Sequence, residues 1–247
     1  MFSTVYLQNS ASIQPRTSQP AENEPLRVCQ KLAKFKVRIK VRKNIGYLYV
    51  TGGEGNAGIL NTVERYDPSS NTWVAVAPMR KARCGHGSAV LDGFLYVVGG
   101  EGVRGDEFCS VERYNPSMNL WEAMAPMSAT DMGEISDLQI IAALGGKLYV
   151  ADGDLMDEED EPAPLLRFDP ESNTWAHVST MINVRDTMAD SFTSFVLDGK
   201  LYVTGGGTLG GISEACPWER YDPSTNEWEE TPLLFGSNEV LRVFCDD

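Results

Sequence analysis

The sequence predicts an all-β fold made of four similar units, each a sheet of four antiparallel strands. Three observations predict it. The 247 residues include 23 glycines and 13 prolines spread along the chain, which is typical of many short strands joined by tight turns. A short strand motif that ends in glycine recurs four times, and a tryptophan follows each copy at a nearly constant interval.

Two motifs define each unit. The first is a strand that ends in Gly-Gly or an equivalent, at Tyr47–Gly53, Phe94–Gly100, Lys147–Gly153 and Lys200–Gly206. The second is a strand closed by a turn, at Val63–Pro68, Val111–Pro116, Leu165–Pro170 and Trp218–Pro223. A tryptophan stands five residues after each proline, at Trp73, Trp121, Trp175 and Trp228, with spacings of 48, 54 and 53 residues.

Turn signals supply the remaining strands. Asp92-Gly93, Gly145-Gly146 and Asp198-Gly199 suit two-residue hairpins, and they join earlier strands near 86–91, 138–144 and 191–197 to the first motif. The sequence Asp-Pro-x-x-Asn, with Asn for Asp in the second unit, then turns the chain into the tryptophan strand, expected at the outer edge. One such sheet exposes two apolar faces, so radial stacking into a β-propeller or partial propeller is predicted.

The unit boundaries follow from these motifs. Blades are predicted at about 34–77, 78–125, 126–179 and 180–232, with a C-terminal strand at 240–244 and a poorly ordered tail at 1–33. The basic segment Lys34–Lys43 alternates apolar and charged residues and is expected to be the first strand of blade one. Its lysines favour an open sheet edge, with nuclear import or an anionic surface as the alternative.

The repeated LYVxGG, VERYDP and Asn-x-Trp elements resemble the kelch repeat over about residues 45–232. This resemblance implies a propeller whose loops recognise proteins. Kelch propellers usually have more than four blades, so either Val240–Phe244 closes the ring against blade one or a second copy covers the open faces. The open, self-associating assembly is favoured. Similar proteins often carry BTB or F-box domains, for which residues 1–44 are unsuited, so a ubiquitin-ligase link would require a separate chain.

Composition limits the classes of partner. The net charge is −14, and residues 1–44 carry +7, which disfavours nucleic-acid binding by the acidic remainder. No apolar run approaches the roughly 20 residues that span a bilayer, so no membrane partner is expected. Five widely spaced cysteines indicate a reducing compartment. We expect a cytoplasmic protein, with organellar or nuclear locations as alternatives.

Candidate chemical sites are few, so neither a cofactor nor a metal is predicted. The glycines of the first motif lack phosphate-loop spacing and are expected to serve close backbone packing: Gly52, Gly53, Gly99, Gly100, Gly205 and Gly206. The acidic run between Asp152 and Glu161 is expected to be a solvated loop, with a basic partner or a cation as alternatives. His86 and His177 belong to no catalytic motif and are expected to pack or lie at the surface.

The repeat tryptophans are expected to be buried between blades. Trp218 occupies the position of Val63 and Val111 and is expected to be a bulky core substitution, with a surface role as the alternative.

The predicted function is a non-enzymatic protein-interaction module, used as a substrate-recognition or scaffold subunit. The partner-binding face is expected on loops 54–61, 101–108, 154–164 and 207–215, beside 78–86, 126–137 and 180–190. Its candidate residues are Arg80, Lys81, Arg83, Arg104, Asp131 and Arg185. For Arg83 and Arg185, structural pairing with carboxylates is the alternative. A kelch-fold enzyme that binds a small molecule or sugar, and a truncated gene product, remain as alternative interpretations.

Overall fold

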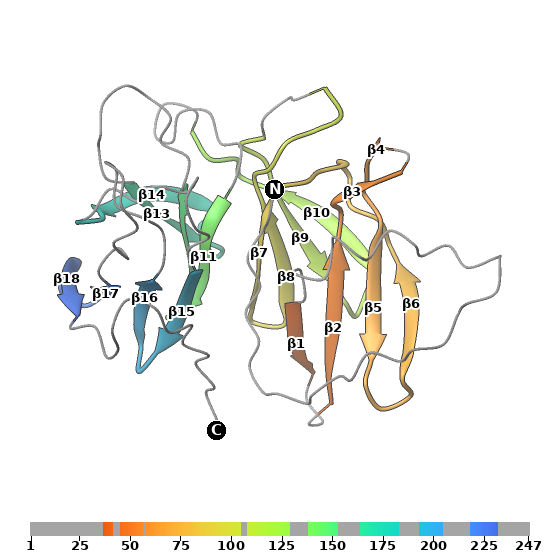
Figure 1. Ribbon diagram of the computed structural model, residues 1–247, viewed down its shortest axis with the longest axis horizontal. Coiled ribbons are helices and arrows are strands. Elements are labelled where there is room, and N and C mark those ends of the chain that lie inside the picture. The colour runs from red at the N-terminus through yellow and green to blue at the C-terminus, as the bar shows by residue number, and fades with distance from the viewer. Residues whose placement is uncertain are drawn as a thin grey trace, which may run out of the picture.

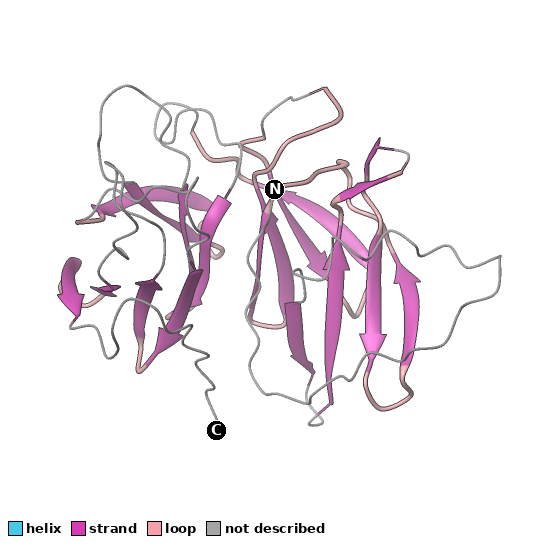
Figure 2. Cartoon of the chain, viewed as in Figure 1, coloured by secondary structure: helices cyan, strands magenta, loops and turns pink. Residues whose placement is uncertain are grey.

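The structure is a computed structural model, and it describes residues 37–41, 45–56, 58–104, 108–128, 138–152, 164–182, 193–204 and 218–231. All regular secondary structure in these ranges is β-strand (Figure 2). The described part of the chain contains no helix that is long and apolar enough to cross a membrane.

Four antiparallel sheets of four strands form the body of the molecule (Figure 1). We call them blades 1 to 4. Blade 1 comprises β1 (Val37–Val41), β2 (Ile45–Thr51), β5 (Val63–Asp67) and β6 (Thr72–Val76). Blade 2 comprises β7 (Gly87–Leu91), β8 (Phe94–Val98), β9 (Val111–Asn115) and β10 (Leu120–Met124).

Blades 3 and 4 repeat this plan. Blade 3 comprises β11 (Leu138–Leu144), β12 (Lys147–Asp152), β13 (Pro164–Asp169) and β14 (Thr174–Thr180). Blade 4 comprises β15 (Thr193–Leu197), β16 (Lys200–Thr204), β17 (Trp218–Asp222) and β18 (Glu227–Thr231). A short ribbon of β3 (Glu54–Gly55) and β4 (Gly58–Ile59) projects from the loop of blade 1.

The strand order within each blade confirms the predicted fold. The chain adds strands sequentially, and the tryptophan strand is always outermost. The first strands of successive blades pack against one another in the order β1, β7, β11, β15. Figure 1 shows β6 and β18 at opposite ends of this arrangement, and β1 and β15 make no contact as extensive as those between the successive first strands. The described blades therefore form part of a propeller with two open ends.

The predicted turns are present. Asp92 and Gly93 both have positive φ, at 50° and 80°, as a two-residue hairpin with the twist of the strands requires. In the Asp-Pro-x-x-Asn turn of blade 1, the Asp67 carboxylate accepts a hydrogen bond from the Ser69 backbone N–H at 2.8 Å. Asn71 then adopts a φ of 55°, which asparagine tolerates well. These local features fix the length and register of each blade.

The core consists of three apolar clusters, one at each seam between consecutive blades. Each blade has a leading face, toward the preceding blade, and a trailing face, toward the next. At the seam of blades 1 and 2, Tyr49 and Val63 of the trailing face pack against Leu95 and Trp121 of the leading face. Equivalent clusters fill the two other seams. Burial of these faces is the main source of stability for the stack.

Hydrogen bonds at the outer rim connect blade 1 to blade 2. The indole N–H of Trp121 donates to the carbonyl of Ala77, just after β6, at 2.8 Å. The side-chain oxygen of Asn119 accepts from the N–H of the same Ala77, also at 2.8 Å. Trp175 and Asn173 make the same two bonds to Ala125 between blades 2 and 3. We call this pair of bonds the rim link.

The tryptophans are not equally buried: Trp121 is buried, whereas Trp175 and Trp228 are half-buried and pack against the seam clusters. Trp73 is 42% exposed, and none of the other described blades packs on the leading face of blade 1. Trp218 is half-buried on the trailing face of blade 4, where its ring meets Phe195 edge-on at 5.9 Å between centroids.

Several predicted features lie outside the described residues. They are the tail 1–33, the acidic residues after Asp152, the strand Val240–Phe244, and Asp131, Arg185, Gly205 and Gly206.

Candidate protein-binding face

Two segments meet at the end of the blades that lies opposite the hairpin turns. One is the linker from blade 1 to blade 2, and the other is the loop that follows β8. Cys84 of the linker exchanges two backbone hydrogen bonds with Glu101 of the loop, at 2.9 and 3.0 Å. The carbonyl of Arg83 also accepts from the N–H of Gly53 in blade 1 at 2.9 Å. The linker is therefore bonded to both blades.

Glycine permits this close approach. Gly100 has a φ of +81°, and a Cβ there would lie 2.4 Å from the carbonyl oxygen of Cys84. Gly52 has a φ of +53°, and its Cβ would lie 2.4 Å from the carbonyl oxygen of Arg83. A side chain at either position would push the linker away from the blades.

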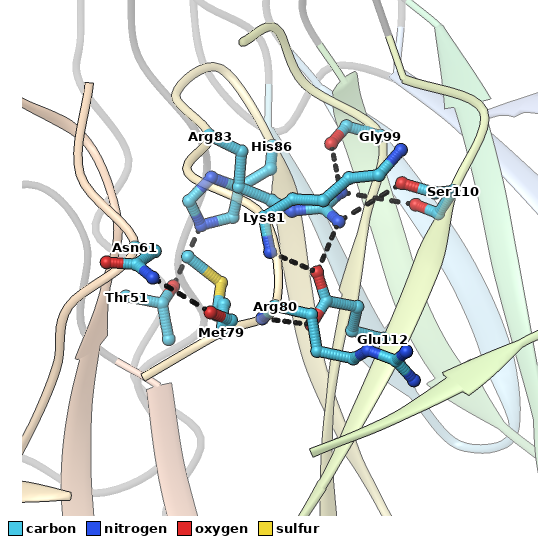
Figure 3. A network of polar contacts seen from close by, with 10 residues as sticks. All are labelled: Thr51, Asn61, Met79, Arg80, Lys81, Arg83, His86, Gly99, Ser110 and Glu112. Atoms are coloured by element: carbon cyan, nitrogen blue, oxygen red, sulfur yellow. Dashed lines mark hydrogen bonds and ion pairs between the residues drawn. The ribbon is translucent and has the colours of Figure 1, made fainter. Parts of the chain in front are cut away.

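Arg83 lies at the centre of a buried polar network (Figure 3). One of its terminal nitrogens donates to the carbonyls of Gly99 and Ser110, at 2.7 and 3.2 Å. The other donates to the hydroxyl of Ser110 at 3.1 Å and to the carboxylate of Glu112 at 2.7 Å. The ion pair with Glu112 is almost completely buried, with side chains 0% and 3% exposed.

The Glu112 carboxylate also holds the linker backbone. Its two oxygens accept hydrogen bonds from the N–H groups of Arg80 and Lys81, at 2.7 and 3.1 Å. Arg83 and Glu112 together therefore fix the path of the residues that precede blade 2. Arg83 was expected on the partner-binding face, but the structure places its side chain in the interior. Its position matches the alternative interpretation, a structural pair with a carboxylate.

Three other candidate residues do lie on the surface. Arg80, Lys81 and Arg104 are exposed around the same pair of segments. The ammonium group of Lys81 lies 4.2 Å from the ring centroid of Phe108, which is half-buried. This is a cation–π contact that orients the lysine over an apolar base. We call Arg80, Lys81, Arg104 and Phe108 the basic loop cluster.

His86 and Cys84 flank the network and are both uncharged at neutral pH. Burial, and then the nearby positive charge of Arg83, lower the pKa of His86 to about 3. Its Nε2 lies 2.8 Å from the hydroxyl of Thr51 in blade 1. Burial and a hydrogen bond to Glu101 raise the pKa of the Cys84 thiol to about 12. A protonated thiol is a poor nucleophile. Both side chains are buried, and both hydrogen bonds join neighbouring segments of the fold.

Sequence reasoning missed Glu112 and Phe108. A signal for Glu112 was present, because Glu64, Glu112 and Glu219 share one position of the second motif. Blade 3 has Leu166 there, and it is also the unit in which Asp131 stands at the position of Arg83. In blade 4, Glu219 is fully buried and its carboxylate accepts from the N–H of Ile182 at 3.2 Å. No comparable signal marked Phe108.

Comparisons with known proteins agree with this architecture. The family described as "Kelch motif" matches residues 46–80 and 82–128. The chain is similar to Kelch-like protein 21 of Homo sapiens, with 32% identity over 80% of this chain, and of Mus musculus, with 35% identity over the same share. It is also similar to Kelch-like protein 26 of Danio rerio, with 28% identity over 85% of this chain.

The chain spans 38%, 38% and 33% of the lengths of these three relatives, so the similarity concerns part of each. Kelch repeats of this type generally form protein-interaction modules. The repeated motifs, the four-stranded blades and the sequence similarities together show that the chain belongs to the kelch-repeat family, through its kelch part.

Proposed function

We propose that this chain is a non-enzymatic recognition or scaffold subunit that binds an acidic segment of a partner protein through the basic loop cluster. The partner lies across the linker of blade 2 and the loop after β8. Its carboxylates pair with Arg80, Lys81 and Arg104, and an apolar side chain contacts Phe108.

One observation carries the proposal: exposed cationic side chains project from a backbone segment that a buried carboxylate holds in place. Arg80 and Lys81 are exposed, yet their backbone N–H groups are bonded to the buried carboxylate of Glu112. A fixed backbone lowers the entropy lost when the side chains engage a ligand. Because the chain has a net charge of −14, this cluster is a local basic site on an acidic protein. Such a site selects its partner by charge complementarity.

The test measures binding of fluorescent acidic peptides by anisotropy. A set of peptides with clustered Asp and Glu around one aromatic or aliphatic residue is compared with the same peptides carrying Asn and Gln. We expect only the acidic set to bind, and we expect binding to weaken as salt concentration rises. The double variant Arg80→Gln with Lys81→Gln should weaken binding by about tenfold or more.

The matched control removes the same number of positive charges at a different place on the protein. Lys147→Gln with Lys200→Gln removes two positive charges at the hairpin turns of blades 3 and 4, far from the cluster. These lysines make only partly exposed ion pairs with Asp169 and Asp222, so the fold should persist. Equal losses of affinity in both double variants would show a general charge effect and would overturn the proposed site.

A further inference from the structure

The leading faces of the four blades carry the same residue types in the same register, but they are not equally buried. In blade 2, Leu95 and Val97 are 0% exposed, Tyr114 is 1% exposed and Trp121 is 5% exposed. The corresponding Leu, Val and aromatic residues of blades 3 and 4 are also buried: Leu148, Val150, Phe168, Leu201, Val203 and Tyr221. Each of these faces is covered by the trailing face of the preceding blade.

Blade 1 has the same face, but no other described blade packs on it. Leu48, Val50 and Tyr66 are only half-buried, and Trp73 is 42% exposed. Trp73 stands where Trp121 donates its indole N–H to the preceding blade. Among the described residues, Trp73 has no such acceptor. Blade 1 therefore presents a complete docking face, including the donor of the rim link, on which no other described blade packs.

The trailing face of blade 4 is also less buried than the corresponding face of blade 2. Phe195, Tyr202 and Trp218 are half-buried, and Leu197 is 41% exposed. Their counterparts in the seams are buried, as Ala89, Tyr96, Val111 and Leu91 in blade 2 show. Phe195 and Tyr202 stack at 5.2 Å between ring centroids. Large aromatic side chains thus form an apolar surface at the position where a further blade would pack.

We propose that a second copy of this chain covers these faces, with the leading face of blade 1 in one copy packed on the trailing face of blade 4 in the other. The occupant is argued from continuity with the existing interfaces, because three seams within the chain already join a trailing face to a leading face of the same kind. The proposed contact is a fourth seam, made between chains.

Charge also favours this head-to-tail arrangement. Residues 37–76, which span blade 1, hold five Lys or Arg and three Asp or Glu, a net charge of +2, whereas residues 193–231, which span blade 4, hold two Lys or Arg and seven Asp or Glu, a net charge of −5. A contact between blade 1 and blade 4 therefore brings opposite net charges together. A contact between two copies of blade 1, or of blade 4, would bring like charges together. The contact is heterologous, so it forms a closed ring when the rotation permits and an open chain otherwise.

The experiment measures sedimentation velocity of the full chain over a range of protein concentrations, with one variant on each face. We expect wild-type protein to self-associate. Trp73→Glu on the leading face and Leu197→Glu on the trailing face should each weaken association by about tenfold or more. Mixing the two variants should restore a complex of one copy of each, because each retains the face that the other has lost.

A control variant on the same strand tests whether the effect depends on which face of blade 1 is changed. Val74 is next to Trp73 and 40% exposed, but it points to the opposite side of β6, across from Arg65. A Val74→Glu variant reproduces the arrangement of blades 2 and 4, in which Arg113 pairs with Glu122 and Arg220 with Glu229. We expect this variant to associate as the wild type does. If Trp73→Glu lowers the melting temperature sharply, Trp73→Gln replaces it.

Three results would overturn the proposal. The first is a wild-type chain that stays monomeric at every concentration, which would favour closure within one chain. The second is self-association of Leu197→Glu that equals that of the wild type, because the trailing face would then be unused. The third is a mixture of the two variants that remains monomeric while each is folded.

Discussion

Arg83 and Glu112 form an ion pair with 2.7 Å between Nη2 and Oε1, and both side chains are buried. Arg83 belongs to the linker that enters blade 2, whereas Glu112 belongs to β9 within that blade. The pair therefore fixes a connection between blades from the inside. Removing one partner of a buried pair leaves an uncompensated charge, which costs far more than the net contribution of the pair.

Arg83→Met should lower the free energy of unfolding by about 3–5 kcal/mol, because Glu112 loses its charged partner. Arg80→Met, three residues earlier and exposed, should change it by less than about 0.5 kcal/mol. Adding Glu112→Leu to Arg83→Met should recover part of the loss, since blade 3 has Leu166 at that position. Urea unfolding measures all three, and equal midpoints for the two single variants would contradict the structural role.

Two tryptophans at equivalent positions should respond differently to truncation. Trp121→Ala should destabilise the protein by about 3–5 kcal/mol, because its ring is buried and its N–H bonds to Ala77. Trp73→Ala should cost clearly less at a protein concentration at which the chain is monomeric, because that ring is 42% exposed. Thermal melts followed by circular dichroism make the comparison. A Trp121→Ala melt within a degree or two of the wild type would remove this residue from the core.

Stability should fall as the pH is lowered through the range in which an unfolded histidine takes up a proton. The pKa of His86 is about 3 in the folded chain, against an ordinary value of 6.5. Between these values the unfolded chain binds a proton that the folded chain does not, so stability decreases by up to about 1.4 kcal/mol per pH unit below 6.5.

Urea unfolding between pH 7 and 5 tests this, because the carboxylates with lowered pKa, such as Asp67 and Asp169, titrate below that window. A His86→Gln variant should lose most of the slope. The same slope in both proteins would assign it to other groups.

Gly100→Ala should destabilise the protein more than Gly93→Ala does. Both glycines have φ near +80°, so each substitution costs about 1–3 kcal/mol of backbone strain. A Cβ at Gly93 meets open space, whereas a Cβ at Gly100 would clash with the carbonyl of Cys84. The difference between the unfolding free energies of the two variants measures the cost of the clash between the added Cβ at residue 100 and the linker. No difference would mean that the linker shifts at little cost.

The sequence predicts the blades well because their determinants are local. The Asp92-Gly93 hairpin depends on two adjacent residues, and the turn from Asp67 to Asn71 depends on five. Strand order then follows from short connections. The outward position of the tryptophan strands follows from the same order, so this part of the fold could be predicted without knowledge of distant contacts.

The candidate site was less predictable because it depends on contacts between separate segments. Arg80, Lys81 and Arg83 are close in sequence and similar in charge, but only Arg83 points into the space beside Glu112. Nothing in the local pattern separates the buried cation from the exposed ones. Phe108 is likewise identified only by its contact with Lys81, which comes from another loop. The exposure of Trp73 depends on whether another blade packs against blade 1, and the repeated motif does not indicate this.

The rim links have a consequence for how the molecule opens. Blades 1 and 4 each have one neighbour, but blade 1 is held by both bonds of the link at Ala77. In blade 4, Asn226 still bonds to Val178, whereas the buried Trp228 Nε1 has no partner within the described residues. The register irregularity between Leu165 and Leu166 lies at this same seam. In a linear stack, each unit opens according to its own interface. Native-state amide exchange should therefore release β16 and β17 before β2 and β5, and tension applied at the two ends of the chain should detach blade 4 as the first discrete step.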